Sequence, residues 1–193
     1  LQIYGGWFRD MSATRKKSFS LEFRSNYGEG RLDETLFSGN AVTSFNDLVL
    51  RAGANDGWNT VWAPYWAPNA GQKQVQYIID EFVRRSHLAM GGLSSHGTFV
   101  NLYINGLYWG LYNLAEKVTG AFAASYCGGR DDTWDVRSQD GVSDGDSTAW
   151  DAMVSLLNTT TVNNTIYQQV QGKNPDGTRN PAYPIYLDID NYI

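Results

Sequence analysis

This 193-residue sequence has few cysteines and histidines and no excess of positive charge. Cys127 is the single cysteine, so the chain cannot close an internal disulfide. The two histidines, His87 and His96, stand apart from it, and no Cys/His cluster has the spacing of a zinc site. The sequence has fifteen basic and 20 acidic residues, and the net charge of −5 argues against nucleic acid as a partner.

Long apolar runs and short catalytic motifs are missing as well. No stretch reaches the roughly 18 apolar residues that a membrane-spanning helix requires, and no signal peptide is visible. The sequence contains no P-loop, no Gly-x-Ser-x-Gly elbow and none of the standard protein-kinase strings for the catalytic and magnesium-binding loops. Any function must therefore be inferred from longer patterns.

Aromatic side chains are abundant, at 14% of the residues, and the clearest pattern lies where they alternate with aliphatic ones. Residues 98–115 form two arms rich in Tyr, Trp, Leu, Val and Ile around Asn105-Gly106. Asn-Gly between strand-like arms is a strong signal for a two-residue hairpin turn, because both central residues take positive φ. We expect a β-hairpin here, followed by a short polar link and a helix over residues 120–126.

Two further segments have a clear period. Residues 17–24 alternate, with Phe19 and Leu21 on one face, and predict a half-buried strand. Residues 74–90 predict the longest helix, with Glu81 on its polar side and Gly91-Gly92 at its end. The apolar stripe of this helix consists of Val75, Ile78, Ile79, Phe82 and Val83.

The order of these elements predicts an α+β fold. Residues 1–118 form a β-rich half that contains the long helix and the hairpin, and residues 119–193 read as helical, with one helix after Ser147 and a weaker one over 162–170. Both ends of the chain lie inside apolar-periodic segments. We therefore expect this chain to be a fragment of a longer protein.

Charged residues near the predicted strands are the candidates for chemistry. Lys16 and Lys17 open a strand, and they are either a solvated strand end or a source of a phosphate-pairing lysine whose helix partner would be Glu81. Arg51 and Asp56 follow another strand, and they either form part of a binding loop or lock that loop as an ion pair.

Metal ligands and catalytic histidines are not expected. Asp140, Asp144 and Asp146 do not have the spacing of an EF-hand loop, and a capped turn before the next helix explains them. His87 and His96 are isolated in the sequence, which is typical of structural or solvated histidines. We assign no chemistry to any of these five residues.

Several short blocks of the sequence occur in a fixed order and together cover nearly the whole chain. The blocks are residues 2–6, 17–24, 27–28, Leu32 with Leu36-Phe37, and residues 48–56, 101–117 and 187–191. Taken together, these blocks resemble the spore-coat protein H (CotH) kinase family, in the version found in large secreted or surface proteins of environmental bacteria.

This resemblance implies an atypical kinase-like fold with a β-rich lobe and a helical lobe. Family members transfer the γ-phosphate of ATP to Ser/Thr of protein partners, using Mg²⁺. By analogy with ordinary kinases, Lys17 and Glu81 would be the nucleotide lysine and its helix partner, with Lys16 or Asp80 as substitutes. The segment around Glu116 would be the connector that meets adenine.

The resemblance also sets limits on this chain. In the family, the aspartates that act as catalytic base and metal ligand lie beyond the block that matches residues 187–191, so no catalytic residue is expected before Ile193 and the fragment itself is expected to be inactive. Gly5-Gly6-Trp7 stands where better-known members have an Arg-Gly-Asn/Ser-rich loop. The implied location is secreted or on a bacterial surface.

A different class of function stays open beside this one. Residues 58–66 carry Trp58, Trp62, Tyr65 and Trp66 in a loop-like stretch. Aromatic faces of this kind stack on sugars or on partner side chains. The alternative is therefore a catalytically silent surface module that binds protein or glycan.

Overall fold

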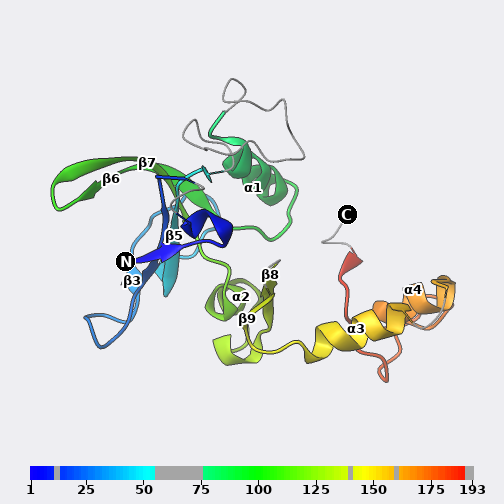
Figure 1. Ribbon diagram of the computed structural model, residues 1–193. Coiled ribbons are helices and arrows are strands. Elements are labelled where there is room, and N and C mark those ends of the chain that lie inside the picture. Colours follow the sequence, from blue (N-terminus) through cyan, green and yellow to red (C-terminus); the bar gives the residue numbers. More distant parts are fainter. Residues whose placement is uncertain (11–13, 55–75, 139–140, 159–160, 190–193) are drawn as a thin grey trace. The chain divides into compact units, whose positions relative to one another are not determined.

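The computed structural model describes residues 1–10, 14–54, 76–138, 141–158 and 161–189. The chain divides into two compact units, Leu1–Trp134 and Asp135–Ile193. Helices and strands are both present, which confirms the α+β class (Figure 1). None of the helices in the described ranges has the length and apolar character that a bilayer crossing requires.

The first unit is built on a five-stranded sheet with the strand order β1-β2-β5-β7-β6. Every neighbouring pair in this sheet is antiparallel. A second, two-stranded sheet pairs β3 with β4. The strands are β1 (Gln2–Tyr4), β2 (Ser18–Glu22), β3 (Leu32–Asp33), β4 (Ser44–Phe45), β5 (Asp47–Arg51), β6 (Gly97–Ile104) and β7 (Leu107–Glu116).

Two apolar clusters hold this unit together. In one, Phe19 of β2 meets Tyr112 of β7, with 5.9 Å between ring centroids, together with residues from the end of β5. In the other, Phe37 and Phe45 make an edge contact at 5.6 Å above Leu48. Because β5 contributes to both clusters, it is the central strand of the core as well as of the sheet.

The predicted hairpin is confirmed. β6 and β7 pair from Gly97↔Ala115 to Ile104↔Leu107, and the two residues between them, Asn105 and Gly106, have φ values of 50° and 79°. The β5 register covers only the last residues of β7, up to Arg51↔Asn113. The outer part of the hairpin therefore extends past the sheet as a ribbon (Figure 1).

The predicted long helix is shorter than expected. Helix α1 spans Ile79–Ala89, whereas residues 74–90 were predicted, and residues 74 and 75 lie outside the described ranges. Tyr77 has φ 66°, which is left-handed backbone that a right-handed helix cannot contain. The helix therefore begins after this residue.

The orientation of α1 is opposite to the one its sequence predicts. Glu81, expected on the polar surface, is 5% exposed, and Phe82, expected to face the core, is 67% exposed. Ile78, Ile79 and Val83 are about half exposed as well. The helix therefore packs on the sheet through its polar side, because charged and amide groups bind it there.

The connector at the end of β7 leads into α2 (Gly120–Cys127), which confirms the helix predicted there. Thr119 caps α2, since its side chain accepts from the Phe122 N–H. A short 3-10 turn, η3 (Asp131–Thr133), packs on α2 and completes the first unit. A second 3-10 turn, η1 (Trp7–Arg9), follows β1.

The second unit contains a small hairpin and two helices. The hairpin pairs β8 (Val136–Ser138) with β9 (Gly141–Asp144) in the acidic stretch before α3. Helices α3 (Thr148–Asn158) and α4 (Asn164–Val170) lie where helices were predicted.

Candidate functional site

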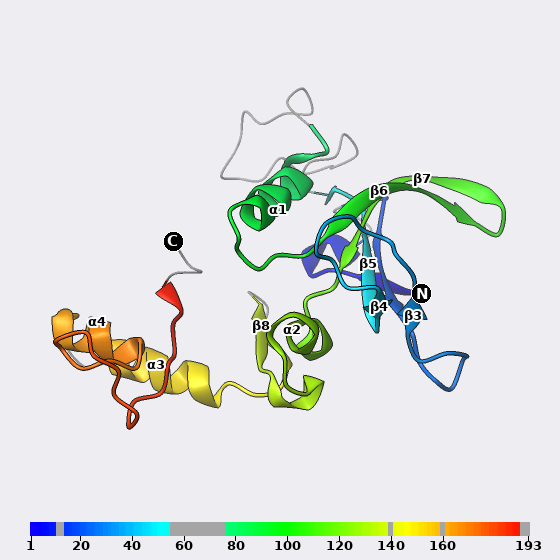
Figure 2. The same cartoon turned by 180° about the vertical axis from the view of Figure 1, so that it is seen from behind.

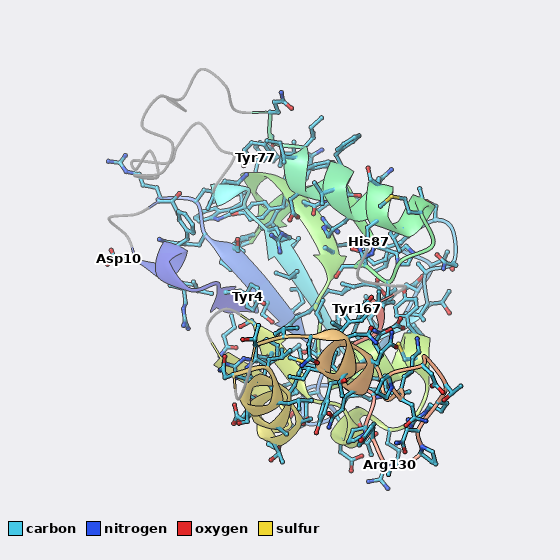
Figure 3. All side chains as sticks on the ribbon, turned by 90° about the vertical axis from the view of Figure 1, so that its right-hand side faces the viewer. Tyr4, Asp10, Tyr77, His87, Arg130 and Tyr167 are labelled. Atoms are coloured by element: carbon cyan, nitrogen blue, oxygen red, sulfur yellow. The ribbon has the colours of Figure 1, made fainter. Side chains whose placement is uncertain are left out.

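A cavity of about 220 Å³ lies in the first unit beside α1. It collects residues from the turn after β1, from the ends of β2 and β5, from α1 and from the hairpin. The lining consists of Tyr4, Gly5, Phe8, Ser18, Arg51, Gly53, Ala54, Tyr77, Asp80, Glu81, Phe99 and Asn113. Figure 3 shows Tyr77 just before α1, at the end of that helix opposite to His87.

Arg51 and Asp80 form a two-pronged ion pair at this cavity. The Arg51 Nε lies 3.0 Å from Asp80 Oδ2, and its Nη2 donates to Oδ1 at 3.1 Å. Asp80 also accepts from Arg84 Nε at 3.1 Å. About half of each side chain in the Arg51–Asp80 pair is exposed, so the guanidinium is held in a fixed orientation and stays reachable from the cavity.

Glu81 is a buried carboxylate surrounded by donors. Its Oε2 accepts from Arg84 Nη2 at 2.7 Å and from Asn113 Nδ2 at 2.8 Å, and its Oε1 accepts from Arg85 Nε at 2.5 Å. Arg84 continues the network to the Ser95 carbonyl at 3.0 Å. This network explains why α1 turns its charged side to the sheet.

Lys17 and Glu81 are not brought together. The Lys17 ammonium is buried, and it donates to the carbonyls of Phe8 at 3.0 Å and Asp10 at 2.5 Å. The Lys17 carbonyl in turn accepts from the Tyr112 hydroxyl at 3.0 Å. Lys17 thus ties the turn after β1, whose Phe8 lines the cavity, to the sheet.

Lys16 lies behind Tyr77 and outside the cavity lining. Its ammonium donates to the Tyr77 hydroxyl and to the Leu111 carbonyl, and it sits 4.5 Å from the centre of the Tyr112 ring. Partial burial lowers the pKa of Lys16. Aromatic faces and oxygen dipoles thus surround this ammonium.

The Glu116 carboxylate is turned into the fold and away from the cavity. Its Oε2 accepts from the His96 backbone N–H at 2.8 Å and lies 2.9 Å from the ring Nδ1. Its Oε1 accepts from the Tyr126 hydroxyl at 2.7 Å. Burial, followed by the bond to Glu116, raises the pKa of Tyr126.

The structure therefore brings two of the five predicted site residues, Arg51 and Glu81, to one cavity, and it places Lys17 and Glu116 elsewhere. Asp56, like the aromatic stretch of the alternative hypothesis, lies outside the described residues. Within the described ranges, no group of three or more His, Cys, Asp or Glu side chains is arranged to hold a metal ion.

Sequence reasoning missed Asn113. One signal was available: Asn113 is an amide in the middle of an otherwise apolar strand end, L-Y-N-L-A. A polar group at such a position has to find a buried partner. Here that partner is Glu81.

Comparison with known proteins gives one result. No curated protein and no solved structure gives a match to this chain. The profile of one family, described as CotH kinase protein, matches residues 1–193, which is the whole chain. The match covers the cavity and every predicted site residue, and the chain belongs to the CotH kinase family.

Proposed function

We propose that this chain supplies the nucleotide-binding part of a CotH-type kinase, and that the phosphates of ATP bind in the cavity beside Arg51. The parent protein would transfer the γ-phosphate to Ser/Thr of secreted or surface proteins in bacteria. The observation that carries the proposal is the fixed, half-exposed Arg51 guanidinium on a cavity lined by the Gly5 turn. A guanidinium presents its donors in a planar fork that suits phosphate oxygens.

The position of Arg51 in the sheet supports this role. In protein kinases the phosphate-pairing lysine sits on the strand that precedes a helix, and a carboxylate of that helix pairs with it. Among the residues that the structure describes, β5 is the last strand before α1, and Arg51 ends β5 and pairs with Asp80 of α1. We therefore assign to Arg51 and Asp80 the roles that the sequence suggested for Lys17 and Glu81.

Lys17 and Glu81 keep a supporting role in this proposal. Lys17 holds the turn that carries Phe8, and Glu81 holds α1 against Asn113. Both act on the shape of the cavity rather than on the phosphate. Glu116 likewise fixes the connector after β7, whose backbone groups are the proposed contact for adenine.

The cavity fits part of ATP. Its volume of about 220 Å³ is below the roughly 300–1,000 Å³ of sites that enclose a drug-sized ligand, so we propose that it receives the phosphates and leaves the base outside it. The fit to Mg²⁺ is poor, because Asp80 and Glu81 already pair with arginines. We assign Mg²⁺ no ligand in this chain.

The test is nucleotide binding by calorimetry, with ATP in the presence and absence of Mg²⁺. We expect ATP to bind, and Arg51→Ala to weaken binding by about tenfold or more, since a hydrogen bond to a charged group contributes about 1.5–3 kcal/mol. The matched control is Arg130→Ala, which removes an exposed arginine of the same unit whose partner is Asp132. Equal affinity of wild type and Arg51→Ala would refute the proposal.

A silent binding module remains the second candidate, and the hairpin ribbon now favours it. Tyr103, Leu107, Tyr108 and Trp109 are all more than half exposed, and no charged residue occurs from residue 97 to 115. Such a surface suits stacking on a sugar or on an apolar partner side chain. A Tyr108→Ala/Trp109→Ala variant that retains ATP binding and no longer attaches to its protein or glycan partner would support this candidate.

A further inference from the structure

We propose that helix α2 moves with the sheet as one body, so that the connector 117–119 is not a hinge. The kinase resemblance implied the opposite, with a second lobe beginning at residue 119. This inference concerns the fold alone, and it stands or falls independently of nucleotide binding. It rests on a polar cluster in which Glu116 and His96 are buried, Tyr126 is half-buried and Asn40 is exposed.

Glu116 joins the sheet to α2 directly. It is the last residue of β7 and is 4% exposed. One carboxylate oxygen accepts a hydrogen bond from the Tyr126 hydroxyl at 2.7 Å, and the other accepts one from the His96 backbone N–H at 2.8 Å. Breaking such a cluster leaves a buried carboxylate without hydrogen-bond partners, which costs much free energy. The bonds on the two sides of the connector therefore open together or not at all.

A second layer of contacts closes the cluster from the side of the small sheet. The Val42 N–H donates to the Tyr126 hydroxyl at 3.1 Å, and His96 Nε2 lies 3.0 Å from Asn40 Oδ1. The Tyr126 ring also lies 5.7 Å from the His96 ring and 4.9 Å from the Phe122 ring. Tyr126 of α2 is thus held by three separate segments of the first unit.

The segment after α2 is tied to α2 in turn. A Cβ on Gly120 would stand 2.3 Å from the Asp131 carbonyl oxygen, so η3 packs directly against the first turn of α2. The Trp134 indole N–H donates to the Gly128 carbonyl at 2.9 Å. The compact unit that contains the sheet ends at Trp134. In both views α2 lies beside the sheet at the end of β7 (Figures 1 and 2).

The first test needs no variant. Amide hydrogen exchange of the whole chain is followed residue by residue at several urea concentrations. We expect the amides of Ala123 in α2 and of Gly128, which ends α2, to open with the free energy and urea dependence of the Ala115 amide in β7. If the α2 amides instead follow those of α3 and α4 in both quantities, α2 belongs with the later residues and the proposal is wrong.

The second test breaks the cluster at one atom. Tyr126→Phe keeps the ring contacts and removes the hydroxyl that bonds Glu116 and Val42. We expect exchange of the α2 amides to rise by about tenfold or more, while exchange in the β6–β7 hairpin changes little. The matched control is Tyr167→Phe on α4, because Tyr167 is 44% exposed.

Each outcome of the second test decides between the two views. A selective rise in α2 for Tyr126→Phe, absent in the Tyr167→Phe control, supports the cluster as the link. No change in α2 refutes it. If Tyr126→Phe raises exchange in α2 and in β7 alike, the two open together, which is the behaviour of one body.

Discussion

The inverted helix α1 makes an unusual prediction: replacing a charged residue costs more stability than replacing a neighbouring aromatic one. Glu81 has a 6% exposed side chain and accepts from two arginines and from Asn113. Removing one partner of a buried ion pair costs about 3–5 kcal/mol. Because Arg84 keeps Asp80 and the Ser95 carbonyl as partners, we take the lower end, about 3 kcal/mol, for Glu81→Ala.

The matched variant is Phe82→Ala, one position along the same helix. Phe82 is 67% exposed, and alanine is the better helix former, so we expect a change below about 0.5 kcal/mol. Urea unfolding followed by circular dichroism measures both variants. For a unit of this size, 3 kcal/mol corresponds to a fall in Tm of about 10 °C. If Phe82→Ala proves more destabilising than Glu81→Ala, the orientation of α1 described above is wrong.

Three further predictions concern single sites. Gly120→Ala should lower the Tm although alanine favours helices, because its Cβ would lie 2.3 Å from the Asp131 carbonyl oxygen, and overpacking of this kind costs about 1–3 kcal/mol. Burial raises the pKa of Tyr112 to about 12. The stability that its neutral form contributes is therefore complete below about pH 10 and is lost as the pH rises toward 12. Measuring the free energy of unfolding at increasing alkaline pH tests this. The hydrogen bond from Arg24 lowers the pKa of Glu22 below its ordinary 4.5. The contribution of the ionised Glu22 to stability is therefore present above that pH and is lost in acid. An NMR titration should show the Glu22 pKa rising in Arg24→Ala.

The features that the sequence predicted correctly depend on neighbours in the chain. The Asn105-Gly106 turn selects the hairpin register through its own backbone. The alternation in β2 likewise predicts Phe19 in the core, where it is found. Such signals need no knowledge of the rest of the fold.

The orientation of α1 depends on a residue far away, and for that reason the sequence pattern misled. Its apolar stripe is a sound local signal for a core-facing side. Glu81, however, finds Asn113, which lies 32 positions later, and this buried partnership outweighs the stripe. The register that brings the two together is set by the hairpin, and no periodicity within α1 reports it.

The candidate site was predicted only in part, because the partners of its charged side chains also lie far away in the sequence. A lysine at a strand start and a glutamate in a helix have the right charges, but a charge predicts no particular partner. Lys17 meets backbone carbonyls and Glu116 meets a histidine and a tyrosine, because each side chain takes the nearest group that compensates its burial. Arg51 was a candidate from its place after a strand, and it does reach the cavity.

Burial separates the charges that shape a site from those that bind a ligand. Glu81, Glu116 and Lys17 are each less than a tenth exposed and bonded to two or more groups, so a ligand would have to break existing bonds to use them. The pair of Arg51 and Asp80 differs, because about half of each side chain is exposed and the guanidinium has more N–H donors than the pair engages. An arriving phosphate adds bonds to Arg51 without removing any, so this pair has the lowest cost of engaging an anion among the predicted charges.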